Sequence, residues 1–193
     1  LRQEGVSVSL SSVKRTLERT HLLKKRSPWK RYHPPQERPV VEKPGDLVEL
    51  DTIHLMTGKK SRVYILTLID VHSRWAYAKA YERISGNSSV LFLKEAQRHA
   101  SFRFTTIQTD HGSEFSSFFT ERSAPAHRYT RIGKPNDNAH IERFNRTVQE
   151  ECLDRTIHTV EHFAAALASY LPYYNEKRSH MGINYQTPLE VLR

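Results

Sequence analysis

The order of hydrophobic and polar positions divides most of the chain into strands and helices. Apolar runs that are continuous or alternate with a period of two are typical of strands, and apolar residues spaced by three and four are typical of helices. Five segments have the strand pattern, at residues 47–53, 63–70, 75–81, 105–109 and 129–132. Four have the helical pattern, at residues 88–100, 113–122, 139–153 and 160–175, the last interrupted near Pro172. The first three strands follow one another as a meander, so this order predicts an α/β fold, a mixed five-stranded sheet with helices on its faces.

A separate helix is predicted near the amino terminus, at residues 6–23. Apolar positions such as Val13 and Leu17 share one face, and basic side chains occupy another. The candidate caps are Ser9, Ser11 and Ser12. The pattern fits the end of a helix-turn-helix, whose recognition helix reads the major groove of DNA, and it fits an ordinary amphipathic packing helix equally well.

Residues 27–45 form a stiff, basic segment with neither pattern. Five prolines fall between positions 28 and 44, and proline disfavours regular structure because it lacks an amide donor and fixes φ. Cationic side chains beside Trp29 and Tyr32 suit contact with a phosphate backbone. A solvated spacer explains the same composition.

The charge is unevenly distributed along the chain. The 193 residues allow one medium domain with a small appendage, and 30 Lys and Arg against 21 Asp and Glu give a formal charge of +9. Residues 1–45 hold 11 of the basic and 4 of the acidic side chains. This amino-terminal excess predicts a polyanionic partner such as nucleic acid, although a merely basic soluble protein has the same balance.

Cysteine content and hydropathy indicate the cellular compartment of the protein. Cys152 is the single cysteine, which excludes an internal disulfide and a structural zinc site made of cysteines. No stretch approaches the roughly 20 apolar residues of a membrane span, and the amino terminus has no signal-peptide core. We therefore expect a soluble, intracellular protein in a reducing compartment. Because the chain begins at Leu1, we also expect that a further part precedes it.

Two aspartates differ from the other acids in their surroundings. Asp51 and Asp110 each end a predicted strand among apolar residues. A carboxylate there is costly to bury unless a cation or a hydrogen-bond donor neutralises it. The carboxyl ends of strands are also where open α/β sheets place ligands. Either aspartate alone is equally well explained as a cap or turn residue, but the two together favour a site.

Glu142 is the third candidate acid. A turn at residues 135–137, with Asn138 as cap, is expected to start the helix that carries Glu142. One face of this helix holds Glu142, Asn145, Arg146 and Gln149, and the opposite, packing face holds Ile141, Phe144 and Val148. The polar face suits a metal at one end and phosphates along its length. A solvated helix face explains Glu142 alone equally well.

These residues carry a resemblance to the integrase core shared by insertion-sequence transposases and retroviral-type integrases. Asp51, Asp110 in the run TDHGSEF and Glu142 in the run NDNAHIERFN resemble its acidic triad. The run YILTLIDVHSRWAYA is similar to the family's second and third strands, and YYNEKRSHMGINYQTPLEVL is similar to its carboxy-terminal signature. The resemblance covers most of the chain, from about residue 44 to 192. Two departures are the 31 residues between Asp110 and Glu142, fewer than is typical, and Ser179, where proline is common.

The resemblance implies a ribonuclease-H-like fold in a chain of three parts. These are a helical DNA-binding segment at residues 1–26, the end of a helix-turn-helix, then the basic linker at 27–44 and the catalytic core at 45–193. It also implies metal-dependent phosphoryl transfer by a DDE transposase or integrase. Cleavage would release a 3′-hydroxyl at the element end, and that hydroxyl would attack target DNA.

The resemblance further implies a cofactor, a set of contacts and partners. Asp51 would bridge two Mg²⁺ ions, for which Mn²⁺ can substitute, and Asp110 and Glu142 would each complete one ion. We expect His111, Gly112 and Glu114 to shape the loop after Asp110. The residues expected to contact DNA are Lys14, Arg15, Arg19, Lys24, Lys25, Arg26, Lys30, Arg31, Lys134, Asn138, His140, Asn145 and Arg146. The expected partners are double-stranded DNA and further copies of the chain, with no membrane and no small-molecule cofactor, in the bacterial cytoplasm at the nucleoid.

Two other functions fit the same sequence. One is a catalytically inert DNA-binding protein, and the intact acidic triad argues against it. The other is a ribonuclease-H-like nuclease that cleaves without joining, which would be recognised by cleavage without strand transfer. For His140, a solvated helix position is the alternative to DNA contact.

Overall fold

The computed structural model describes residues 8–20, 22, 37–57, 61–123, 125–131 and 135–193, in two compact units, residues 1–34 and 35–193. The described part of the first unit is helix α1, Leu10–Arg19, with its flanks. Of the three candidate caps, Ser9 caps the helix, because its side chain accepts a 3.1 Å hydrogen bond from the Ser12 amide. The helix is shorter than expected, since Thr20 already forms a turn beyond its end. No residue of α1 is buried, which leaves its basic side chains exposed.

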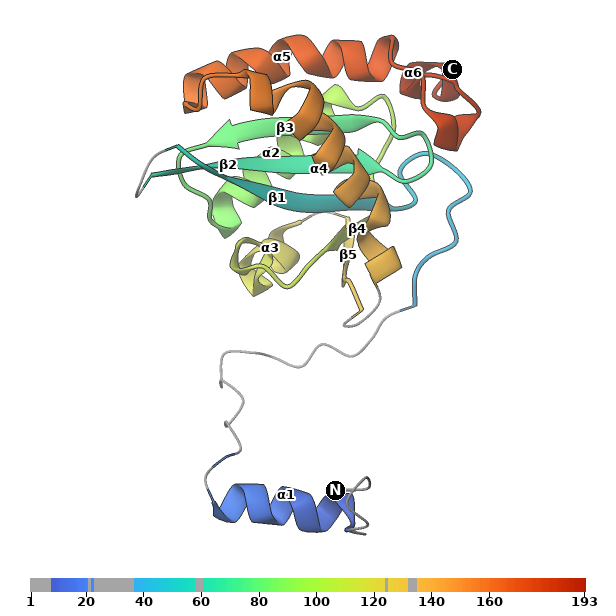
Figure 1. Ribbon diagram of the computed structural model, residues 1–193. Helices are drawn as coiled ribbons and strands as arrows, with labels where there is room; N and C mark the ends of the chain where they lie inside the picture. The colour runs from blue at the N-terminus through green and yellow to red at the C-terminus, as the bar shows by residue number, and fades with distance from the viewer. Residues whose placement is uncertain (1–7, 21, 23–36, 58–60, 124, 132–134) are drawn as a thin grey trace. The chain divides into compact units, whose positions relative to one another are not determined.

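A five-stranded sheet forms the centre of the second unit (Figure 1). Its strands are β1, Val48–Met56, β2, Arg62–Asp70, β3, Ala76–Tyr81, β4, Thr106–Thr109, and β5, Ala126–Tyr129. They lie in the order β3-β2-β1-β4-β5, in which β3, β2 and β1 are antiparallel neighbours, and β4 is parallel to both β1 and β5. The predicted meander and mixed five-stranded sheet are therefore confirmed.

Helices cover both faces of the sheet (Figure 1). The helices α4, Ala139–Glu151, and α5, Val160–Glu176, pack on one face, and α2, Gly86–His99, and α3, Ser117–Arg122, on the other. The remaining helical segments are short: Ser113–Phe115, Pro135–Asn138, Leu153–Arg155, Met181–Ile183 and α6, Pro188–Val191. Because successive strand residues face opposite sides, β2 sends Ile65 and Ile69 to the α4 and α5 side, and Leu66 and Leu68 to the α2 side. Within the described residues, no helix is long and apolar enough to cross a membrane.

The last strand lies earlier in the sequence than its pattern predicted. The prediction of a strand at 129–132 is wrong, because β5 runs from Ala126 to Tyr129 in register with β4, and Ile132 lies outside the described residues. Polar residues conceal this strand in the sequence. Arg128 is 2% exposed and lies 3.4 Å from Asp137, so its charge is neutralised by a contact that local periodicity cannot show.

Two helices also differ from their predictions. Pro172 does not interrupt α5, which continues to Glu176. A proline removes one backbone hydrogen bond, but Pro172 is exposed, and its neighbours Leu171 and Tyr174 are buried in the core and hold the helix against the sheet. The helix predicted at 113–122 is divided at Ser116 into a 3₁₀ turn and α3, and α4 ends at Glu151 before a second 3₁₀ turn.

Side chains of the carboxy-terminal signature attach α5 to the sheet and to α4. The Asn175 amide accepts a hydrogen bond from the Ala76 backbone N–H and donates one to its carbonyl, both 2.9 Å long. Arg178 pairs with Glu151 at 2.7 Å, and Glu151 also accepts from the Tyr170 hydroxyl. These contacts satisfy polar groups at the edge of β3 and fix the distal end of α4.

Candidate active site

Two of the candidate acids lie where the parallel strands β1 and β4 separate. The parallel pairing ends with Glu49 opposite Gln108, and Asp51 and Asp110 each follow two residues later. Residues two apart on a strand share a face, so Asp51 faces the side that α4 covers, as Glu49 does. Asp110 follows the end of β4 as expected. Asp51 is not at a strand end, because β1 continues beside β2 to Met56.

Asp51 is fixed by neighbours on its own strand and on α4. Its Oδ1 accepts a 2.8 Å hydrogen bond from the Thr52 amide. Its Oδ2 accepts a 2.8 Å hydrogen bond from the side-chain amide of Asn145. Asn145 was expected to contact DNA, and the structure places it against a candidate catalytic acid. Its DNA contact stays a prediction.

The loop after β4 brings a fourth acid to the site. Asp110 Oδ1 accepts a 2.8 Å hydrogen bond from the Gly112 amide, and Glu114 Oε1 accepts one of 2.8 Å from the Thr52 hydroxyl. A Cβ at Gly112 would lie 2.7 Å from Glu114 Oε2 and 2.9 Å from Asp110 Oδ1. A larger residue here would require the side chains of these two acids to shift. The expectation that Gly112 and Glu114 shape this loop agrees with these contacts.

Glu142 lies in the first turn of α4, three residues before Asn145. Because residues three apart share a helix face, both lie on the side of α4 turned toward Asp51. The opposite face packs as expected, with Ile141, Phe144 and Val148 buried. Glu142 itself is exposed. The helix thus brings the solvent-accessible carboxylate of Glu142 to the side of the partly buried carboxylate of Asp51 on β1.

The other acids of the site act on the charge of Asp51. The pKa of Asp51 is raised to about 6, chiefly by burial, with the Thr52 hydrogen bond opposing the rise. The negative charges of Asp110, Glu114 and Glu142 raise this pKa further. A carboxyl group whose pKa is raised by burial and by like charges is a common feature of catalytic sites.

The donor set fits a hard divalent cation. These four carboxylates offer only oxygen ligands, which Mg²⁺ and Mn²⁺ prefer, and a cation would relieve their mutual repulsion. As they lie, no three acidic, histidine or cysteine side chains in the described ranges are close enough together to hold an ion. Coordination would therefore draw the carboxylates closer together.

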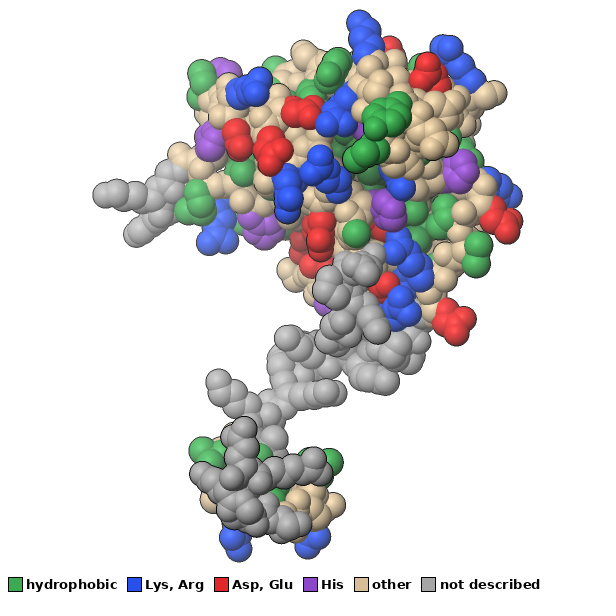
Figure 2. All heavy atoms as spheres, turned by 45° about the vertical axis from the view of Figure 1, so that its right-hand side comes forward, with side chains coloured by type: hydrophobic (Ala, Val, Ile, Leu, Met, Phe, Trp, Pro, Cys, Tyr) green, Lys and Arg blue, Asp and Glu red, His purple; other side chains and the backbone are tan. Residues whose placement is uncertain are grey.

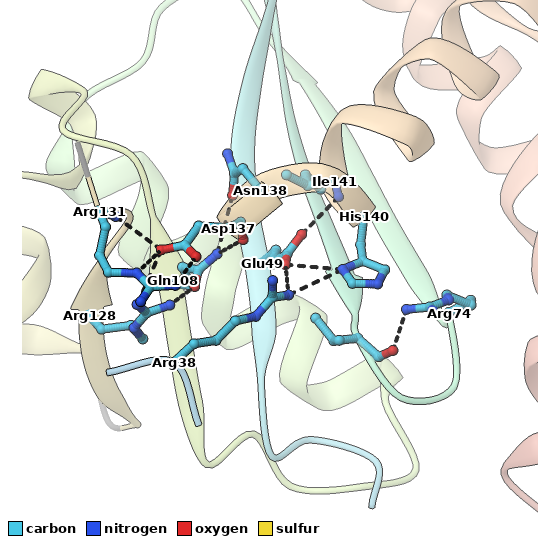
Figure 3. Close-up of polar contacts among 11 residues, drawn as sticks. Arg38, Glu49, Arg74, Gln108, Arg128, Arg131, Asp137, Asn138, His140 and Ile141 are labelled. Carbon is cyan, nitrogen blue, oxygen red and sulfur yellow. Dashed lines mark hydrogen bonds and ion pairs between the residues drawn. The ribbon is translucent and has the colours of Figure 1, made fainter. Parts of the chain in front are cut away.

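A buried polar network holds the start of α4 against the sheet (Figure 3). Glu49, fully buried on β1, accepts hydrogen bonds from the Ile141 amide at 2.9 Å and from Arg38 Nη2 at 2.8 Å. His140 Nδ1 lies 3.3 Å from the same carboxylate. His140 was expected to contact DNA. Its ring instead lies between α4 and β1, and the DNA contact remains a prediction.

A second part of the network anchors the turn that precedes α4 (Figure 3). Asp137 is 2% exposed and pairs with Arg131 at 2.7 Å and with Arg128 at 3.4 Å. Hydrogen bonds and the charge of Arg131 hold the pKa of Asp137 well below its usual range. Gln108 connects Arg128 to the Asp137 carbonyl. Asn138 stands at the cap position, but its side chain makes no cap hydrogen bond, contrary to expectation, and lies 3.4 Å from Gln108.

Four of the other residues expected to contact DNA are described in the structure, on α4 and on α1. Arg146 is exposed on α4, and acidic and basic side chains are interspersed over the face of the second unit in Figure 2. Lys14, Arg15 and Arg19 are exposed on α1. The remaining six, Lys24, Lys25, Arg26, Lys30, Arg31 and Lys134, lie outside the described residues.

Sequence reasoning missed Glu49 and gave Glu114 only a role in loop shape. Glu49 precedes Asp51 by two residues, so strand periodicity alone places both on one face. Glu114 lies four residues after Asp110, in the run used for the resemblance. Strand parity was thus an available signal for Glu49, whereas the contact of Glu114 with Thr52 requires the tertiary structure.

Known proteins are similar to this chain in sequence and in fold. A protein of Burkholderia multivorans called "Insertion element IS407 uncharacterized 31.7 kDa protein" is 31% identical over 154 residues, which cover 76% of this chain and 55% of the relative. The "Transposase for insertion sequence element IS904" of Lactococcus lactis subsp. lactis is 28% identical over 152 residues, 75% of this chain and 58% of the relative. The chain thus spans about half the length of the curated relatives it matches.

The fold resembles that of a retroviral integrase core. The HTLV-2 integrase catalytic core domain, solved in complex with magnesium in a dimeric form, superposes with a TM-score of 0.57 at 15% identity, covering 78% of this chain and 98% of that one. This likeness confirms the predicted ribonuclease-H-like fold class. Two family models described as "Integrase core domain" match residues 41–135 and 125–188. Together they extend over most of the second unit and include all three triad positions, and the chain belongs to the integrase core domain family.

Proposed function

We propose that this chain is the catalytic part of a DDE transposase that cleaves the 3′ ends of an insertion sequence and joins them to target DNA. The observation that carries the proposal is the position of Asp51, Asp110 and Glu142, where β1 and β4 separate beneath α4. Membership of the integrase core domain family supports it. A relative named as a transposase supports the link to insertion sequences.

In this chemistry the chain positions DNA and metal, and the nucleophile is a water molecule or a DNA hydroxyl. In the first step a water oxygen attacks phosphorus, and the bond from phosphorus to the 3′ oxygen breaks, which leaves a free 3′-hydroxyl. In the second step that hydroxyl attacks a phosphodiester of the target, and the target's own 3′ oxygen leaves. Two divalent cations, held by Asp51, Asp110 and Glu142, would stabilise negative charge on the attacking and leaving oxygens.

Residues around the triad would keep this arrangement in place. The Thr52 amide and Asn145 orient the two oxygens of Asp51, and the Gly112 amide orients Asp110. Glu142 extends from α4 into solvent, where a bound DNA end would reach it. Arg146, which is exposed one turn further along the helix, would contact the phosphate backbone.

The remaining parts of the chain would bind DNA. Exposed cations on α1 suit the phosphates of the element end, and the basic excess of residues 1–45 supports a role in sequence-independent attraction. Two element ends must be joined in concert, so we further propose that the active form contains more than one copy. Its site of action would be the bacterial cytoplasm.

A strand-transfer assay tests this function. A labelled duplex taken from the DNA flanking the gene is incubated with supercoiled plasmid and Mg²⁺ or Mn²⁺, and a gel shift on the same duplex verifies binding. Wild type should give joined products, and Asp110→Asn and Glu142→Gln should abolish them without loss of binding. Glu95→Gln is the matched control, because this acid pairs with Lys79 on the far side of the sheet.

Each other result supports a different reading. Nicked duplex without joined plasmid would favour a nuclease. Binding without nicking or joining, with either metal, would overturn catalysis by this chain and favour a DNA-binding protein.

A further inference from the structure

Glu49 is a buried carboxylate that serves as a cap for α4 from a different element. It is 0% exposed, and its Oε2 accepts a 2.9 Å hydrogen bond from the amide of Ile141, the third residue of the helix. The first amides of a helix lack partners within the helix and carry its positive dipole end. The side chain of Asn138, at the usual cap position, accepts no hydrogen bond from these amides. A residue of β1 therefore satisfies the first turn of α4.

Arg38 brings a positive charge into direct contact with this buried carboxylate. Its Nη2 lies 2.8 Å from Glu49 Oε1, and its side chain is only 24% exposed. An unpaired carboxylate in this position would be costly, because burial removes its hydration. His140 Nδ1 also lies 3.3 Å from Oε1. Figure 3 shows Arg38, Glu49 and His140 converging at the start of the helix.

The same hydrogen bond connects two elements that carry candidate catalytic acids. Glu49 lies two residues before Asp51 on β1, and Ile141 directly precedes Glu142 on α4. The 2.8 Å contact between Asn145 and Asp51 forms the second connection, one turn along the helix. A shift in the first turn of α4 would therefore move Glu142 and Asn145 relative to Asp51.

We propose that Arg38 and Glu49 form a positioning pair that sets the place of the first turn of α4, and with it the distance from Glu142 and Asn145 to Asp51. This inference rests on the proposed function for its catalytic consequence. Neither residue touches the reacting atoms. Arg38 lies near the end of the basic linker. Through its pair with the buried Glu49, this part of the linker would help to position the acids of the site.

The variants that test the pair are Arg38→Met, Arg38→Lys and Glu49→Gln, with the double variant Arg38→Met/Glu49→Gln. Lys79→Met is the matched control, because it breaks a 2.6 Å ion pair between β3 and α2, away from α4. Hydrogen exchange of peptides covering residues 139–146 reports the first turn of α4 directly. Calorimetric Mn²⁺ binding reports the acids, and cleavage as a function of Mg²⁺ concentration reports catalysis.

We expect Arg38→Met to accelerate exchange at residues 139–146 and to weaken Mn²⁺ binding by about tenfold, as loss of outer-sphere partners does at metal sites. The Mg²⁺ concentration for half-maximal cleavage should rise by a similar factor, with duplex affinity unchanged. Arg38→Lys should restore part of each effect. The double variant should lose about as much as one single variant, because the two residues act as one unit.

Three results would overturn the pair. One is loss of duplex affinity in Arg38→Met with wild-type exchange in α4, which would make Arg38 a DNA contact. Another is a lower melting temperature with wild-type exchange and Mn²⁺ binding, as expected for Lys79→Met. The third is additive losses in the double variant. If wild type cleaves no DNA, the proposed function fails, but hydrogen exchange and Mn²⁺ binding still test the positioning role. If Arg38→Met does not fold, the same two measurements on Glu49→Gln test it.

Discussion

The side-chain amide of Asn145 donates a 2.8 Å hydrogen bond to Asp51, across 94 positions of sequence. This contact connects α4 to β1 at the point where the acids gather. The amide oxygen of Asn145 is buried and has no hydrogen-bond partner in the described part of the chain. The hydrogen bond from Asn145 to Asp51 therefore orients the carboxylate from the helix side.

Replacing Asn145 with Ala should impair the metal site more than DNA binding. Loss of the amide frees one oxygen of Asp51, and the loss of a group that orients a ligand typically costs 10-fold to 100-fold in metal affinity or activity. We expect the Mg²⁺ concentration for half-maximal cleavage to rise by at least about tenfold. A fall in duplex affinity with an unchanged Mg²⁺ requirement would instead assign Asn145 to DNA.

The neighbouring variant Arg146→Ala should impair DNA binding more than the metal site. Arg146 is exposed, and a phosphate contact contributes equally for all sequences. We expect weaker binding to every duplex and a slope of log affinity against log salt that is smaller by about 1. A loss limited to one sequence would mean that Arg146 reads bases.

Asp51→Asn should stabilise the metal-free protein at neutral pH. The pKa of Asp51 is raised to about 6 in the folded protein, whereas an aspartate in the unfolded chain has a pKa of about 4. The folded state therefore binds this proton more tightly, and the contribution of Asp51 to stability falls as pH rises from about 4 to about 6. At pH 7 the ionised group costs up to about 3 kcal/mol.

Urea unfolding in the presence of a chelator measures this effect. Asp51→Asn should exceed wild type at pH 7, and the difference should disappear near pH 4. A variant that is less stable than wild type at pH 7 would show that Asp51 is not in conflict with its surroundings.

Asp137→Asn should destabilise the fold at neutral pH. Its carboxylate is buried between two arginines, and removing one partner of a buried ion pair costs about 3 kcal/mol or more. The pKa of Asp137 is lowered, so its stabilising contribution is present above about pH 4 and is lost as pH falls below that value. The gap between variant and wild type should therefore close in acid. The exposed Asp154 provides the control, Asp154→Asn, which should change little at any pH.

The sequence predicted the parts of this site that depend on local pattern. The strand that contains Asp51 and the short strand that precedes Asp110 follow from the sequence pattern, and the packing face of α4 follows from helical spacing. The relation between Asp51, Asp110 and Glu142 came from resemblance, because periodicity cannot bring three distant segments together. The family comparisons agree with that resemblance.

What the sequence did not predict depends on register and on distant polar pairs. Only the pairing of Glu49 with Gln108 shows that Asp51 and Asp110 stand level with each other. The contact between Glu49 and Ile141 spans 92 positions, and the buried strand residue Arg128 is paired with Asp137, nine positions away. A charged residue gives no sign in the local pattern that its partner lies elsewhere in the chain.

A change of metal preference at Asp110 tests whether this acid holds a catalytic metal ion. A thiolate is a softer ligand than a carboxylate and is poorly suited to Mg²⁺, whereas Mn²⁺ is the less demanding ion. We expect Asp110→Cys to bind duplex normally, to be inactive in Mg²⁺ and to regain cleavage and joining in Mn²⁺. Wild-type activity of Asp110→Cys in Mg²⁺, or equal inactivity with both ions in a folded, DNA-binding variant, would contradict a metal-holding role for Asp110.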